Sequence, residues 1–216
     1  PPPLDTLRRQ RQMCIRDSFT TNRRETLLAL VFAAGYGTCF YIVFVYLPEW
    51  LSSQGLMERS TALAINTAMT VMVLPLMPLG ALVGDRLLPR RTWIALALTL
   101  LCGAAVPLSI WMLATGGSLQ AVVVTHAITF ALLAVPLGSG PALFVELFPA
   151  SDRLSGYSVA FNLGVGVFGG LTPMLATSLI AATGVIIAPA WYLAVACAIA
   201  VAALAMMPDR SRGPLQ

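Results

Sequence analysis

Residues 119–147 read LQAVVVTHAITFALLAVPLGSGPALFVEL and carry no charged side chain before Glu146. A helix needs about 20 apolar residues to cross a hydrocarbon core about 30 Å thick, and uncharged stretches of that length are rare in soluble proteins. Five other stretches of the same character surround this one. The six predicted spans are Thr26–Trp50, Thr61–Val83, Thr92–Ala114, Leu119–Leu147, Gly156–Ala182 and Ile187–Met207. The sequence therefore predicts an all-α membrane protein, a bundle of six transmembrane helices.

The composition of the chain agrees with this class. Of its 216 residues, 58% are hydrophobic and only 10% are charged, and the mean hydropathy is +0.83. The net charge of +4 comes from arginines in the predicted loops and ends, so no basic face is left for a nucleic acid. We expect the lipid bilayer as a partner and no nucleic acid.

The placement of the arginines predicts the orientation of the chain. All 13 basic residues are arginines, and only Arg59 falls on the opposite side of the predicted spans from the others. Short loops rich in arginine stay in the cytoplasm. Both termini and the loops at 84–91 and 148–155 are therefore predicted to be cytoplasmic. The loops at 115–118 and 183–186 are predicted to face the other side.

Small residues and prolines mark places where the helices are expected to pack closely or bend. Gly80 with Gly84, and Gly166 with Gly170, are four residues apart, a spacing that lets helix backbones approach closely in lipid. Prolines in membrane helices create weak points that bend or line cavities. Six prolines interrupt the predicted apolar helices in this way: Pro75, Pro78, Pro107, Pro136, Pro141 and Pro173.

Two predicted loops carry acidic and basic residues beside the membrane. Asp85 and Arg86 follow the second span, and Glu146 and Arg153 flank the loop after the fourth. Opposite charges at the mouth of a cavity can close it by pairing and open it by parting. We predict that these four residues form a gate. The alternative is that the charges are solvated at the helix ends.

His126 is the one histidine, and it lies well inside the fourth predicted span. Ionisable side chains within a membrane are functional candidates by default. We treat His126 as a candidate proton relay, with a helix-packing role as the alternative.

Five stretches of the chain resemble a known family. GALVGDRLLPRR at 80–91 resembles the loop motif of the major facilitator superfamily, as it recurs in the second half of those proteins. PLGSGPALFVELFP at 136–149, followed by RLSGYSVAFNLG at 153–164 and FGGLTP at 168–173, is similar to the metabolite:proton symporter family within that superfamily. FYIVFVYLP at 40–48 is similar to the seventh helix of that family.

This resemblance covers residues 26–207 and implies the C-terminal half of a twelve-helix major facilitator fold. Members of the family carry proline and betaine, α-ketoglutarate, citrate and shikimate. We therefore expect a fragment of a secondary active transporter in a bacterial cytoplasmic (inner) membrane, which moves a small organic acid or zwitterion with protons by alternating access. The expected partners are the N-terminal six-helix half of the parent chain, the solute and protons. No cofactor is expected.

The resemblance also selects candidate substrate contacts. In this superfamily, the helices that match the first and fourth spans face the central cavity. Aromatic faces there would suit a quaternary ammonium, and hydroxyls would suit a carboxylate. The expected contacts are Tyr36, Tyr41, Thr129 and Ser139, with Asn66 and Asn162 as secondary ones.

The beginning of the chain differs from the rest. Residues 1–18 have neither the apolar core of a signal peptide nor helical periodicity. The string QMCIRDS at 12–18 also resembles a translated sequencing-adapter remnant. We predict a leader over 1–25 whose first 18 residues are not native, a six-helix half-domain over 26–207 and a cytoplasmic tail over 208–216.

A membrane protein of this kind could also be an enzyme, or a scaffold or receptor. An intramembrane serine protease needs Gly-x-Ser-Gly, but Leu137 occupies the first glycine position before Ser139. A single histidine also cannot supply a zinc-binding pair. We therefore expect no enzyme and no metal site, whereas a non-transporting membrane scaffold or receptor stays open.

Overall fold

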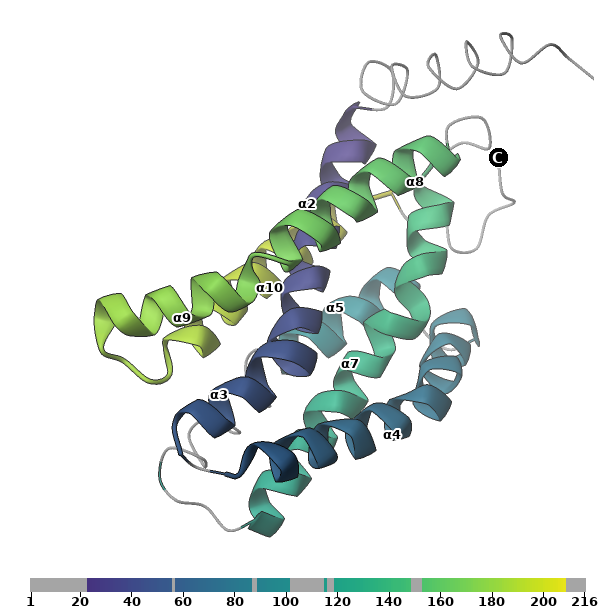
Figure 1. The fold of residues 1–216 in the computed structure, drawn as a ribbon. Coiled ribbons are helices and arrows are strands. Elements are labelled where there is room, and N and C mark those ends of the chain that lie inside the picture. Colours follow the sequence, from purple (N-terminus) through teal and green to yellow (C-terminus); the bar gives the residue numbers. More distant parts are fainter. Residues whose placement is uncertain are drawn as a thin grey trace, which may run out of the picture.

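The computed structural model describes residues 23–55, 57–86, 89–101, 115, 119–148 and 153–208. Every element of secondary structure in these ranges is a helix (Figure 1), and η1 and η3 are π-helical. The elements are α2 (Arg23–Tyr41), η1 (Ile42–Tyr46), α3 (Leu47–Ser53), α4 (Arg59–Arg86), α5 (Arg90–Leu100), α7 (Leu119–Leu147), α8 (Arg153–Phe161), η3 (Asn162–Gly169), α9 (Thr172–Thr183) and α10 (Ala188–Met206). The described part of the chain is all-α, as predicted.

Five helical runs are long and apolar enough to cross a membrane. The first, Arg23–Ser53, joins α2, η1 and α3, and another, Arg153–Thr183, joins α8, η3 and α9. The helices α4, α7 and α10 supply the other three. These runs match five of the six predicted spans to within a few residues at each end. The remaining predicted span, Thr92–Ala114, is described only as far as Leu101, and residues 102–114 lie outside the described ranges.

The helix α2 lies at the centre of the bundle (Figure 1). It packs against α10 and against α8 and η3. Phe32 of α2 contacts Phe144 of α7 with ring centroids 5.1 Å apart, and Phe144 contacts Phe161 of α8 at 5.7 Å. Tilted and edge-to-face ring pairs of this kind add to the free energy gained by burying apolar area. The first, fourth and fifth spans therefore share one aromatic core.

The helices α4 and α7 cross with their backbones in close contact. A Cβ atom added to Gly138 would collide with the carbonyl oxygen of Met77, and one added to Gly80 would lie 3.3 Å from the Cα atom of Val135. Small residues permit such an approach between helices in lipid. The close packing predicted at Gly80 is confirmed.

Both ends of the described chain lie at the same end of the bundle. Arg24 Nη2 donates a hydrogen bond to the carbonyl oxygen of Met206 at 3.4 Å, which joins the start of α2 to the end of α10. At the opposite end, the turns after α3 and α9 contain Gly55 (φ 66°) and Gly184 (φ 68°) in the left-handed conformation that favours glycine. This placement of the two ends agrees with the six spans predicted from the sequence.

Candidate functional site

Widened turns interrupt the first and fifth helical runs. The π-helical segment η1 is followed by Pro48, and η3 by Pro173, each in the first turn of the next helix. A proline has no N–H for the carbonyl four residues earlier, and its ring crowds that carbonyl unless the helix adjusts. The carbonyls concerned belong to Phe44 in η1 and Gly169 in η3. Because π-helical turns occur frequently at functional sites, these two turns mark the candidate site.

Asn66 of α4 supplies the hydrogen bond that Pro48 cannot make. Its Nδ2 donates to the carbonyl oxygen of Phe44 at 3.3 Å. Amide side chains re-satisfy freed backbone groups in this way where water is scarce. The half-buried Asn66, expected as a secondary substrate contact, therefore ties the second span to the π-helical turn of the first.

The π-helical turn η3 lies directly against α2. A Cβ atom added to Gly164 would collide with Ala33, and one added to Gly169 would lie 3.1 Å from the Cα atom of Gly37. On the α2 side, a Cβ atom added to Gly37 would lie 2.8 Å from the Cα atom of Val165. This contact between the first and fifth spans depends on glycine in both helices.

The glycines predicted to pack closely, Gly166 and Gly170, do not contact another helix in the described part of the chain. A Cβ atom added to Gly166 would have no atom within 4 Å, and one added to Gly170 would meet the carbonyl oxygen of Gly166 in the same segment. The prediction assumed α-helical spacing, in which residues four apart share a face. Because η3 closes its hydrogen bonds over five residues, Gly164 and Gly169 face α2 instead.

The two predicted tyrosine contacts on the first span differ in exposure. Tyr36 is buried, and its ring centroid lies 6.2 Å from those of Phe32 and Phe161. Tyr41 is half-buried, and its ring edge borders Gly169 of η3. Tyr41 is therefore the more accessible of the two.

The hydroxyl groups predicted on the fourth span hydrogen bond to backbone carbonyls. Ser139 Oγ donates to the carbonyl oxygen of Gly80 at 3.4 Å, and that oxygen also accepts from Trp93 Nε1 at 3.0 Å. Thr129 Oγ1 donates to the carbonyl oxygen of Thr125 at 2.8 Å. Both hydroxyls are buried. Ser139 thus connects α4 with α7 at their crossing.

Asn162 is exposed at the start of η3, where its Nδ2 donates to the carbonyl oxygen of Ser158 at 2.7 Å. His126 is buried in α7. Among the predicted substrate contacts, Asn162, Tyr41 and Asn66 are the ones that keep exposed surface.

The four predicted gate residues lie toward one end of the bundle. Asp85 and Arg86 are exposed at the end of α4, whereas Glu146 and Arg153 are half-buried where α7 ends and α8 begins. Because successive spans alternate in direction, this is the end that also holds Arg24 and Met206. Residues 149–152 of the intervening loop lie outside the described ranges.

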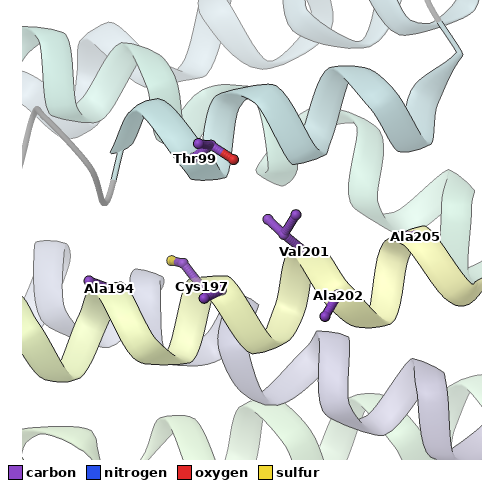
Figure 2. Close-up of a pocket in the computed structure, with 7 residues that line it drawn as sticks. Thr99, Ala194, Cys197, Val201, Ala202 and Ala205 are labelled. Atoms are coloured by element: carbon purple, nitrogen blue, oxygen red, sulfur yellow. The ribbon is translucent and has the colours of Figure 1, made fainter.

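A groove of about 470 Å³ runs between α5 and α10 (Figure 2). The hydroxyl of Thr99 is its polar group on α5, and this hydroxyl donates to the carbonyl oxygen of Ala95 in its own helix. The α10 side is lined by Ala194, Cys197, Ala198, Val201, Ala202 and Ala205. This groove offers apolar contact and includes no residue selected from the sequence.

The comparisons with known proteins point to one family. An ectoine/proline transporter of Corynebacterium glutamicum is 30% identical over 196 residues, which cover 89% of this chain and 38% of that protein. A citrate-proton symporter of Klebsiella pneumoniae is 28% identical over 212 residues, 96% of this chain and 47% of that protein. A putative proline/betaine transporter of Staphylococcus aureus is 25% identical over 185 residues, 79% of this chain and 36% of that protein.

These relatives confirm the resemblance of the chain to the metabolite:proton symporter family of the major facilitator superfamily. The chain spans less than half the length of these relatives. No family model matches the chain. No solved structure matches it either.

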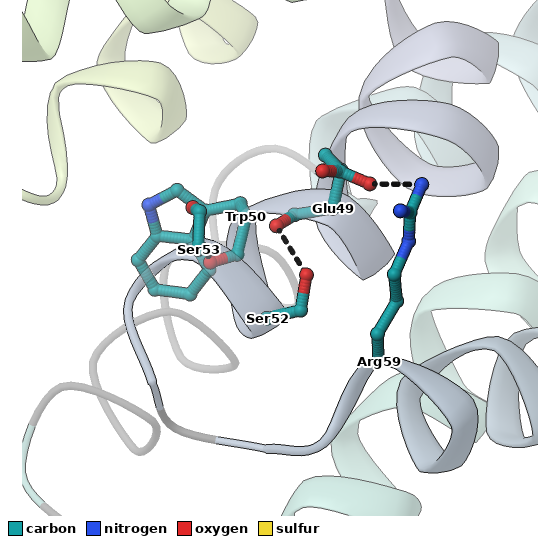
Figure 3. A network of polar contacts seen from close by, with 5 residues as sticks. All are labelled: Glu49, Trp50, Ser52, Ser53 and Arg59. Carbon is teal, nitrogen blue, oxygen red and sulfur yellow. Dashed lines mark hydrogen bonds and ion pairs between the residues drawn. The ribbon is translucent and has the colours of Figure 1, made fainter.

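A polar cluster that the sequence did not predict lies at the end of the bundle away from Arg24 and Met206. Arg59 Nη2 lies 3.2 Å from Glu49 Oε2 (Figure 3), so the one arginine that broke the charge asymmetry is an ion-pair partner. Beside Glu49, Trp50 is buried. The charge pattern, with Glu49 and Arg59 at facing helix ends, was the available signal for the pair.

Proposed function

We propose that this chain is the C-terminal half of a twelve-helix secondary transporter. It moves a small organic acid or zwitterion together with a proton by alternating access. The observation that carries the proposal is the match to transporters and proton symporters over 79% to 96% of the chain. The orientation follows from the arginines: both termini lie in the cytoplasm of a bacterium whose inner membrane holds the protein.

The π-helical turns support a conformational cycle. Helices that alternate between two arrangements need points where the backbone bends at low cost. The turns η1 and η3 are such points, and the glycine contact between η3 and α2 lets the first and fifth spans move against each other without side-chain interlocking. The bends around Pro48 and Pro173 would therefore open and close the solute path.

The solute path is proposed to run past the residues selected from the sequence. Tyr41 and Asn162 are the leading contacts because both keep exposed surface on the first and fifth spans. We assign to the same path, behind these two contacts, Asn66, Tyr36, Thr129 and Ser139, and we assign proton transfer to His126. The gate at the cytoplasmic mouth is assigned to Asp85, Arg86, Glu146 and Arg153.

The substitutions Tyr41→Ala and Asn162→Ala test the path in the complete transporter. Each should raise the KM for the transported solute by about tenfold, the usual effect of losing a hydrogen bond to a charged group or a cation–π contact. Membrane levels should stay unchanged. Tyr192→Ala on α10 is the matched control. Unchanged KM and rate in both variants would place these side chains against lipid or neighbouring helices.

Uptake by cells that express the complete reading frame tests the proposal as a whole. Proline, glycine betaine, ectoine and citrate are offered in turn, with and without a protonophore. Protonophore-sensitive accumulation of at least one of them is expected. A scaffold or receptor predicts a folded protein at normal membrane levels that accumulates none of the four.

A further inference from the structure

One backbone oxygen, the carbonyl oxygen of Gly80, receives hydrogen bonds from two other helices. Trp93 Nε1 of α5 donates to it at 3.0 Å, and Ser139 Oγ of α7 donates to it at 3.4 Å. A carbonyl oxygen has two lone pairs and can accept more than one hydrogen bond. Trp93 is half-buried and Ser139 is buried, so competition from water is weak at this place. The helices α4, α5 and α7 therefore meet at one atom, which we call the Gly80 junction.

Glycines bring the three helices within reach of this junction. Gly80 and Gly138 lie where the backbones of α4 and α7 are in close contact, so the short side chain of Ser139 can cross from one helix to the other. The third helix follows α4 after a short connection, because α4 ends at Arg86 and α5 begins at Arg90. Trp93 lies in the first turn of α5 and reaches back to α4.

The junction supports the part of α4 that carries the predicted gate residue Asp85. Pro75 and Pro78 lie inside α4 before Gly80, and each lacks the N–H that would bond to a carbonyl in the preceding turn. Prolines weaken a helix at such places, so the direction of the segment beyond them depends on contacts with its neighbours. Asp85 lies five residues beyond Gly80, roughly 7.5 Å along the helix axis. The two hydrogen bonds at Gly80 therefore act between the prolines and the gate.

We propose that Trp93 is a positioning residue for the gate, which acts by holding the carbonyl of Gly80 and thereby fixing the place of Asp85 relative to the end of α7. The inference rests on the proposed function, since Asp85 is assigned there to the cytoplasmic mouth. Loss of the indole N–H releases the end of α4, and the release has the same consequence as loss of the Asp85 charge. A bond with only a structural role would stabilise the fold without changing how open the mouth is.

The substitution Trp93→Phe in the complete transporter tests this role, because it keeps an aromatic ring and removes the N–H. The transporter is reconstituted in vesicles without solute, and the labelling rate of a cysteine introduced at Ser155 reports how open the cytoplasmic mouth is. We expect Trp93→Phe to change this rate by about two- to fivefold, the effect of one uncharged hydrogen bond on an equilibrium, in the same direction as Asp85→Asn. Adding Trp93→Phe to Asp85→Asn should cause no further change, since the two residues act in one network.

A second variant and two controls accompany this measurement. Ser139→Ala removes the other hydrogen bond to Gly80 and should shift the labelling rate in the same direction. Trp191→Phe is the same substitution at a residue of α10 that is 67% exposed, and it should leave the rate unchanged. Thr99→Ala on α5 removes a hydroxyl that bonds to the carbonyl of Ala95 in its own helix, and it should also leave the rate unchanged.

The outcomes separate this inference from the proposed function. If Asp85→Asn changes the labelling rate and folded Trp93→Phe does not, this inference alone is overturned, even if Trp93→Phe melts at a lower temperature. Additive effects of Trp93→Phe and Asp85→Asn would also overturn it, because the indole would then act independently of Asp85. If Asp85→Asn has no effect, the gate assignment is wrong and this inference falls with it, whereas solute uptake tests transport separately. If Trp93→Phe does not fold, Ser139→Ala decides, alone and combined with Asp85→Asn.

Discussion

At the scale of single residues, Gly164 decides whether the first and fifth spans can touch. Gly164→Ala would drive a methyl group into Ala33 and to 2.8 Å from the backbone nitrogen of Ala34. Overpacking of this kind costs about 1–3 kcal/mol. We expect a lower melting temperature for the complete transporter, measured by size-exclusion chromatography after heating. Gly140→Ala, whose added methyl group would lie in ordinary contact 3.6 Å from Tyr36 Cε2, should melt like the wild type. Equal melting of both variants would contradict the described contact.

The hydrogen bond from Asn66 to Phe44 gives a second prediction at this scale. Asn66→Leu keeps the side-chain volume and removes the hydrogen-bond donor. The carbonyl oxygen of Phe44 then loses its bond to Asn66, and Pro48 has no N–H to replace it. Hydrogen bonds between membrane helices contribute about 0.6 kcal/mol on average, and an unpaired carbonyl adds to the loss. The variant should melt a few degrees lower, whereas Thr67→Ala, whose hydroxyl bonds only within α4, should not. No difference between these variants would mean that η1 holds its shape without Asn66.

At the scale of helical elements, the spans were predictable and the turns within them were not. Hydrophobicity decides where a chain crosses lipid, so the predicted fourth span and α7 have the same bounds. Pro48 and Pro173 were visible in the sequence, yet whether a proline kinks a helix or widens a turn depends on the helix beside it. Trp50 shows the same limit, because it borders a cavity whose other wall is α9, more than a hundred residues away in the chain.

The predicted gate residues lie where α4 and α7 end and where α8 begins. Asp85→Asn or Arg153→Ala in the complete transporter should change the labelling rate of a cysteine introduced at Ser155 by up to about fivefold, since exposed charge pairs contribute about 0–1 kcal/mol each. Insertion into the membrane should be unaffected. Arg23→Gln at the same end is the control for loss of a positive charge. Combining Asp85→Arg with Arg153→Asp should restore part of the change if the two residues pair. An unchanged labelling rate in every variant would show that these residues are solvated loop charges and not a gate.

At the scale of the whole molecule, the spans differ in how much of their surface this chain covers. The most apolar windows of the first and fourth spans are 56% buried, but those of the second and fifth are only 17% buried. Exposed apolar residues such as Leu74 on α4 and Phe168 on η3 are therefore available to lipid or to another domain. The chain spans less than half the length of its relatives, and a second six-helix half packed on these two spans would complete the proposed transporter.

Coupling between solute movement and proton movement can be measured in proteoliposomes. The complete transporter is reconstituted with a pH-sensitive dye inside the vesicles, and proline, glycine betaine, ectoine and citrate are added without an imposed gradient. We predict that the transported solute acidifies the vesicle lumen as it enters, with the same time course as uptake of the labelled solute. Solute entry without any change in the internal pH, or no entry through a folded protein, would contradict proton symport.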